Sequence, residues 1–232
     1  MVSAAQMVEV DRLMQDKYGI KLIQMMENAG HALARLVHTL HPQGSILVLA
    51  GTGGNGGGGL VAARWLCGWG RQVSVVTTRP RTGFRDVPGH QLDSVGGLAA
   101  GLGAAASKDE LARIRTDIII DGVLGYSMSG KPRGLARHYI EFMNESQAAV
   151  VSLDLPSGIH PDKGVLHPPV VKADQTLTLA LPKASFEMPE VKEQLGELYL
   201  ADIGVPRQLW DRHFSELDYQ NPFEEGDVVR LK

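Results

Sequence analysis

Two aspartates each end an apolar run, and this placement suits acid–base chemistry. Asp121 follows the run 118–120, and Asp154 follows the run 149–153 and comes shortly before Pro156. A carboxyl group can act first as a general acid and then as a base. The same residue at a strand-to-helix turn can instead cap a helix. The proline and the serine after it favour a site at Asp154.

The third candidate feature is the glycine-rich stretch 51–59, between the apolar runs 46–50 and 60–66. Ordered glycine costs backbone entropy and contributes no side chain, so such a run is hard to explain by packing. We expect a strand, a glycine turn and a helix, with a ligand that approaches the backbone of the turn. A flexible linker is disfavoured, because linkers seldom lie between a buried strand and an apolar helix.

Alternating strands and helices are expected to bring these features together. Strands are predicted at 46–50, 72–77, 117–120, 149–153, 176–181 and 198–203. The pattern predicts an α/β fold: a doubly wound, mostly parallel sheet with helices on both faces, as in a Rossmann-like three-layer sandwich. Ligands of such sheets bind outside the carboxyl ends of the strands, so the glycine stretch and both aspartates should meet at one edge.

Other segments complete the expected fold. Ser3 and Gln6 predict a capping box before a first amphipathic helix. A second helix follows, and its methionines are expected to pack in the hydrophobic core. Residues 79–106 are the least informative, and their Ala- and Gly-rich part is expected to form a loosely packed helix. We expect one domain over 1–232, with 215–232 as a peripheral tail.

Composition excludes several classes of function. Lys plus Arg total 23 against 26 Asp plus Glu, for a net charge of −3, and no basic run is present to follow a nucleic-acid backbone. The single cysteine, Cys67, cannot form an intrachain disulfide and fits a reducing compartment. Because neither a signal peptide nor a membrane-spanning run is evident, we expect a cytoplasmic protein with no membrane partner.

Two common nucleotide-binding classes fit poorly. A dinucleotide dehydrogenase needs an acidic residue about 20 positions after its glycines to hold the ribose, whereas this region offers Thr77, Thr78, Arg79 and Arg81. A phosphate-loop NTPase needs Gly-Lys-Ser/Thr after its first glycines, and here Gly56 precedes further glycines.

Short motifs extend along nearly the whole chain. They are MENAG at 26–30, the glycine stretch with LVAAR at 60–64, DGVLG at 121–125 with SG at 129–130, DLPSG at 154–158, KAD at 172–174, PK at 182–183 and DIGVP at 202–206. In this order they resemble the NAD(P)H-hydrate epimerases, also called the YjeF N-terminal domain family.

The resemblance implies a repair activity, the interconversion of the R and S epimers of hydrated NADH or NADPH. A partner, an NAD(P)H-hydrate dehydratase, would return the repaired cofactor to use. The kinase-like dehydratase domain fused to some relatives has no counterpart in this sequence, so this dehydratase is expected to be a separate protein. The resemblance also allows a homodimer.

The resemblance assigns roles to individual residues. A potassium ion would be held by Asn55, Asp121 and Ser157. Asp154 is the residue that we expect to act as general acid and base. The substrate contacts carried over are Gly54, Asn55, Gly56, Gly57, Gly58, Gly125, Tyr126, Ser127, Met128, Ser129, Gly130, Lys131 and Asp154.

Two positions depart from the family pattern. Relatives usually read Gly-Asn-Asn-Gly-Gly-Asp-Gly, whereas this chain has glycine at 54 and 58 in place of an asparagine and the aspartate. Lost polar contacts can weaken substrate binding and rate. The alternative is therefore a non-catalytic nucleotide-binding or scaffold protein on the same fold. An ordinary NAD-linked oxidoreductase is a third, disfavoured hypothesis.

Overall fold

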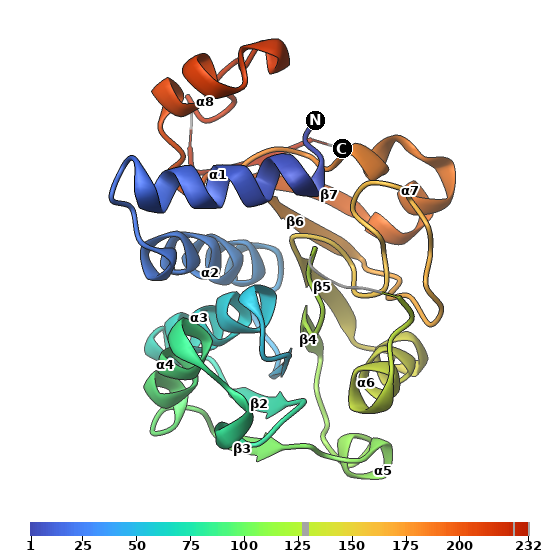
Figure 1. The fold of residues 1–232 in the computed structure, drawn as a ribbon. Helices are drawn as coiled ribbons and strands as arrows, with labels where there is room; N and C mark the ends of the chain where they lie inside the picture. Colours follow the sequence, from blue (N-terminus) through green and yellow to red (C-terminus); the bar gives the residue numbers. More distant parts are fainter. Residues whose placement is uncertain (127–129, 225, 232) are drawn as a thin grey trace.

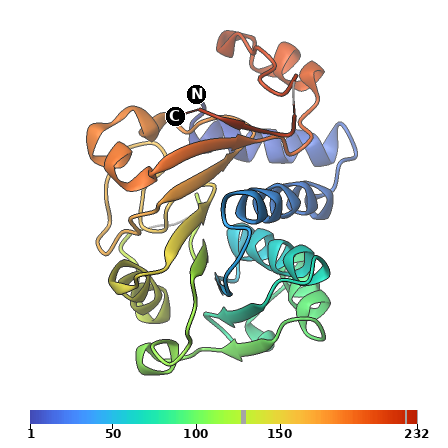
Figure 2. The same cartoon turned by 180° about the vertical axis from the view of Figure 1, so that it is seen from behind.

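An eight-stranded sheet forms the centre of the computed structural model, which describes residues 1–126, 130–224 and 226–231 (Figures 1 and 2). The strands are β1 (Ile46–Ala50), β2 (Val73–Thr77), β3 (Gly101–Ala104), β4 (Ile118–Gly122), β5 (Ala149–Leu153), β6 (Gln175–Leu179), β7 (Glu197–Ala201) and β8 (Val228–Arg230). Their order is β3-β2-β1-β4-β5-β6-β7-β8, and all neighbours are parallel except β7 and β8.

Helices cover both faces of the sheet. They are α1 (Ala4–Asp16), α2 (Leu22–Leu40), α3 (Gly54–Gly68), α4 (Asp86–Val95), α5 (Lys108–Leu111), α6 (Gly134–Glu145), α7 (Pro189–Leu195) and α8 (Arg207–His213), with short 3-10 turns at Arg81–Gly83, Ala184–Glu187 and Ser215–Leu217. Figure 1 shows α2, α3 and α4 on one side of the sheet and α5 and α6 on the other. The predicted doubly wound, mostly parallel α/β fold is confirmed.

Side-chain alternation along β1 explains the two-sided core. Ile46, Val48 and Ala50 pack with α2, α3 and α4, whereas Leu47 and Leu49 pack with α5 and α6. All five residues are fully buried, as expected for a parallel strand covered on both faces. The strand order reverses between β1 and β4, so the crevice at their carboxyl ends is where such a sheet binds ligands.

The first helix covers its own chain. Its capping box, Ser3 with Gln6, is present as predicted. Its buried face packs against Ile203, Trp210 and Phe214, which follow β7 and lie before, within and just after α8. This helix therefore closes one end of the ligand crevice.

Two strands lie where the sequence predicted none. The expected loosely packed helix in 79–106 is wrong in part: α4 is followed by the edge strand β3, which takes its stability from backbone bonds to β2, such as Ala100 N–H to Val73 O at 2.8 Å. Within 215–232, β8 pairs with β7 and occupies the other edge. Gly101 and Gly103 carry no strand propensity, which hid β3.

Candidate active site

The glycines after β1 are helical, so the predicted glycine turn over 51–59 is wrong beyond its first residues. Helix α3 begins at Gly54. A Cβ on Gly51 would lie 2.0 Å from Val123 O, and one on Gly56 would lie 1.8 Å from Gly51 O. These glycines are required because protein backbone, not ligand, approaches them. Packing therefore explains much of the run.

The remaining glycines of the run divide into packed and open positions. A Cβ on Gly57 would meet Met26 Sδ at 2.4 Å, and one on Gly58 would meet Leu153 Cδ2 at 2.5 Å. Nothing lies within 4 Å of a Cβ built on Gly54, which is exposed. Of the predicted substrate contacts in α3, only Gly54 presents an open backbone, and Leu153 fills the space beside Gly58.

Asn55 ties the start of α3 to the ends of two strands. Its Nδ2 donates to Leu153 O at 2.7 Å and to Leu124 O at 3.1 Å. A Cβ on Gly125 would lie 2.8 Å from Asn55 Oδ1, so glycine at 125 leaves room for this amide. The predicted convergence of the glycine stretch with the loop after β4 is confirmed.

Asp121 lies inside β4, and its buried carboxylate collects four hydrogen bonds. Oδ1 accepts from Ser157 Oγ at 2.6 Å and Val123 N–H at 3.2 Å. Oδ2 accepts from Ser152 Oγ at 2.9 Å, because the β4–β5 register places Asp121 beside Ser152, and from Ser157 N–H at 2.9 Å. Burial raises the pKa of Asp121, while these hydrogen bonds act in the opposite direction.

Asp154 follows β5 and forms a buried ion pair with Lys183. The Lys183 ammonium lies 2.6 Å from Asp154 Oδ1, and both side chains are almost completely buried. The chain runs from Asp154 to β6 without a helix, so the helix-cap interpretation does not hold. Asp154 also has φ +66°, in the left-handed region, a conformation that non-glycine residues seldom adopt outside functional or turn positions.

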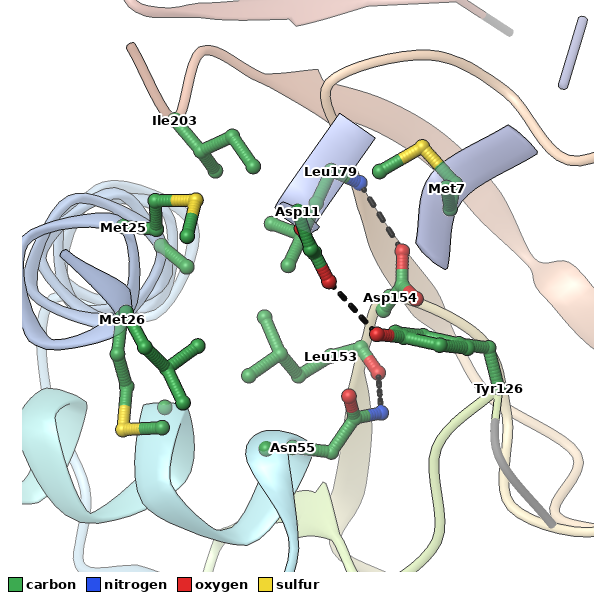
Figure 3. A pocket seen from close by; sticks show the side chains of 14 residues that line it. Met7, Asp11, Met25, Met26, Asn55, Tyr126, Leu153, Asp154, Leu179 and Ile203 are labelled. Carbon is green, nitrogen blue, oxygen red and sulfur yellow. Dashed lines mark hydrogen bonds between the residues drawn. The ribbon is translucent and has the colours of Figure 1, made fainter. Parts of the chain in front are cut away.

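A cavity of about 90 Å³ lies between α1, α2, α3 and the strand ends (Figure 3). Its polar groups are Asp11, Asn55, Tyr126 and Asp154, and the rest of its wall is apolar or glycine: Met7, Leu22, Met25, Met26, Ala29, Gly54, Gly58, Leu153, Leu179 and Ile203. An apolar pocket with a few convergent polar groups is the usual form of a small-molecule site.

Sequence reasoning missed two functional candidates: Asp11, which lines this cavity, and Lys183, which pairs with Asp154 behind the wall. Asp11 lies on the face of α1 that carries Met7, Val10 and Met14, and Tyr126 O–H donates to its Oδ2 at 2.7 Å. An acidic residue on the buried face of an amphipathic helix was the signal that could have identified Asp11. Lys183 belongs to the PK motif at 182–183, but its pairing with Asp154 depends on the fold and could not be predicted from that motif.

The predicted substrate residues do not all gather in one place. Asn55, Tyr126 and Asp154 line the cavity, together with Gly54 and Gly58. Outside this wall, Gly56 and Gly57 are buried in α3, Gly125 adjoins Asn55, and Gly130 and Lys131 are exposed in the loop after β4. Ser127, Met128 and Ser129 lie outside the described residues.

The three residues assigned to potassium do come together. Ser157 Oγ contacts Asp121 and accepts from Leu124 N–H at 2.8 Å, and Leu124 O accepts from Asn55. Side-chain and carbonyl oxygens are the ligands that hard cations prefer. Within the described part of the chain, Asp121 has no ion-pair partner, so a cation fits its buried charge.

Comparison with known proteins identifies the family. Residues 22–185 match the family described as YjeF-related protein N-terminus. The chain belongs to this family. The match covers α2, α3 and the strands β1 to β6, and it therefore contains Asn55, Asp121, Asp154 and Lys183.

Relatives match nearly the whole chain. An NAD(P)H-hydrate epimerase of Dehalogenimonas lykanthroporepellens is 41% identical over 97% of this chain and 90% of its own length. A bifunctional NAD(P)H-hydrate repair enzyme Nnr of Moorella thermoacetica is 34% identical over 93% of this chain but only 42% of its own length. The crystal structure of the yeast protein ynu0 has the same fold, with a TM-score of 0.84 and 24% identity over 100% of this chain and 99% of that one.

Proposed function

We propose that this protein is an NAD(P)H-hydrate epimerase, an isomerase that interconverts the R and S epimers of hydrated NADH or NADPH. The observation that carries the proposal is the full-length similarity to a relative of that name, at 41% identity. The cavity at the carboxyl ends of β1, β4 and β5 supports it, because Asn55 and Asp154 line its wall. We found no observation that favours the non-catalytic alternative.

The reaction requires a carbon to exchange the face that carries its hydroxyl group. That carbon also bears a ring nitrogen, so the C–O or C–N bond must break and form again on the opposite face. A carboxyl group beside this carbon assists by giving and then taking back a proton. Met25, Met26 and Leu153 make the surrounding cavity wall apolar, which limits the number of water contacts near a bound substrate.

Asn55, Asp121 and Ser157 would hold a potassium ion in this proposal. The bound ion supplies positive charge that offsets the buried Asp121 carboxylate. The residues themselves join α3, the end of β4 and the turn after β5 by the hydrogen bonds described above. Fixing these three elements holds Asp154 in the cavity wall, which orients it towards substrate.

A functional partner follows from the bifunctional relatives. This chain matches only 42% of the length of the Moorella repair enzyme. We therefore propose an NAD(P)H-hydrate dehydratase activity as the consumer of the epimerised product. No helix among the described residues is long and apolar enough to cross a membrane. A cytoplasmic location and a homodimer stay predictions.

A coupled assay tests the function. Purified protein is mixed with the R-hydrate of NADPH and an S-specific dehydratase, and the recovery of NADPH is followed. We expect recovery well above the spontaneous rate, and a strongly reduced rate in the Asp154→Asn variant. Recovery at the spontaneous rate by the wild-type protein would contradict the proposal.

A further inference from the structure

Two carboxyl groups line the same cavity from different elements and in different surroundings. Asp11 comes from α1 and Asp154 from the end of β5, and Figure 3 shows both beside the ring of Tyr126. When two acids share a site, their surroundings decide which carries a proton and which stays ionised. The contacts of each carboxyl group therefore assign its role.

The surroundings of Asp154 give it a cationic partner and fix its carboxyl group in place. Its Oδ1 receives Lys183 Nζ at 2.6 Å, Leu179 N–H at 3.2 Å and Thr178 Oγ1 at 3.3 Å. Lys183 is itself fixed by Thr178 Oγ1, Leu179 O and Leu181 O at 3.0 to 3.2 Å. The ion pair and the two hydrogen bonds therefore hold Oδ1 of Asp154 in one place in the cavity wall.

The second oxygen of Asp154 is free for a ligand. Every hydrogen bond and ion pair that Asp154 makes through its side chain with the described residues uses Oδ1. Figure 3 shows the other oxygen on the side of Tyr126. A carboxylate oxygen that no described residue binds, on a residue of the cavity wall, is a suitable contact for a positively charged group.

Asp11 has the opposite surroundings. Met7 and Met25 line the cavity with it, and among the described residues its side chain has one hydrogen-bond partner, the Tyr126 hydroxyl at 2.7 Å. Burial raises the pKa of Asp11 most. Its hydrogen bond with Tyr126 lowers it, the negative charge of Asp154 raises it and the positive charge of Lys183 lowers it. A carboxyl group in an apolar pocket is the one that can give and recover a proton.

We infer that Asp11 is the proton-carrying catalytic residue and that Asp154, with Lys183 behind it, is a fixed negative charge facing the reacting ring. This division of roles rests on the proposed epimerase function. It also makes α1 part of the active site, although the matched family region begins only at residue 22.

The chemical step balances without an oxidant or reductant. Protonated Asp11 gives its proton to the hydroxyl oxygen, the C–O bond breaks, and its electron pair leaves with water. The lone pair of the ring nitrogen forms a C=N bond, and the resulting cation faces Asp154. Water then adds to the other face, the C–O bond forms again, and the released proton returns to Asp11.

The pH dependence of the rate tests this assignment. In the coupled assay, with the spontaneous rate subtracted, kcat of the wild type should fall as pH rises through the raised pKa of Asp11. Asp11→Asn keeps an acceptor for Tyr126 but has no carboxyl proton to give. Its kcat should therefore fall about 10²–10⁴-fold and should no longer decrease as pH rises, a decrease that we call the pH limb. Asp154→Asn should be slow while keeping the limb. Asp16→Asn, on the exposed side of α1, should behave as wild type.

Two further measurements separate a catalytic from a structural role. Tyr126→Phe removes a hydrogen bond that lowers the pKa of Asp11, so the limb should move to higher pH. Asp11→Asn should melt no lower than wild type at neutral pH, since it removes a carboxylate that is costly to bury. An active wild type whose Asp11→Asn variant keeps the limb overturns this inference alone. A wild type without activity overturns the proposed function as well.

Discussion

The buried Asp154–Lys183 ion pair is expected to contribute to the stability of the protein. Removing the ammonium in Lys183→Met leaves Asp154 buried at 3% exposure without a counter-ion. Breaking a buried pair in this way costs about 3–5 kcal/mol. We expect a loss of this size in the free energy of unfolding, measured by urea denaturation.

An exposed ion pair on a neighbouring element supplies the control. Lys192 Nζ lies 3.2 Å from Glu187, and 41% and 62% of the two side chains are exposed. Lys192→Met should therefore cost no more than about 1 kcal/mol. Equal stabilities for the two variants would show that burial does not strengthen the Asp154–Lys183 interaction.

The departure from the family at Gly58 also has a structural partner. A Cβ at this position would lie 2.5 Å from Leu153 Cδ2, so the leucine occupies the space of the missing side chain. Leu153 and Gly58 therefore lie side by side in the cavity wall, with no gap where the side chain at position 58 is absent.

Among the helices and strands, α3 is the one whose start was predicted wrongly from the sequence. Dense glycine suggested a turn open to a ligand, but Gly51 and Gly56 are required by contacts of the backbone with itself. Sequence alone cannot distinguish close approach of a ligand from close approach of protein backbone, because both require a residue without Cβ. The geometry of β1 and β4 decides between them.

Two alanine variants in the first turn of α3 check this interpretation. Gly56→Ala places a Cβ 1.8 Å from Gly51 O, and overpacking against backbone should cost about 3 kcal/mol. Gly54→Ala meets nothing within 4 Å and should stabilise the protein by about 0.4–1 kcal/mol, because it reduces the entropy of the unfolded chain. Thermal and urea unfolding of both variants measure the difference, and a Gly56→Ala variant as stable as wild type would contradict the packing role.

At the scale of the whole molecule, the sequence predicted the parallel core and the edge at which the candidate residues meet. The continuous apolar runs of β1, β4 and β5 made this prediction possible, because strands covered on both faces have such runs. The strands β3 and β8 were missed because edge pairing, not side-chain pattern, stabilises them. Asp11 was missed because α1 joins the site only through tertiary packing.

We predict that potassium binding depends on the folded molecule as a whole, because Asn55, Asp121 and Ser157 come from three separate parts of the chain. An ion that binds only the folded state stabilises it by RT ln(1 + [K⁺]/Kd), about 2.7 kcal/mol at 100 times Kd. We expect the melting temperature to rise with KCl more than with choline chloride at the same ionic strength. Asp121→Asn should abolish the difference between the two salts, because it removes the charge that the ion offsets. Since salt screening acts equally in both solutions, identical melting temperatures for the wild type would exclude potassium binding at this site in the folded protein.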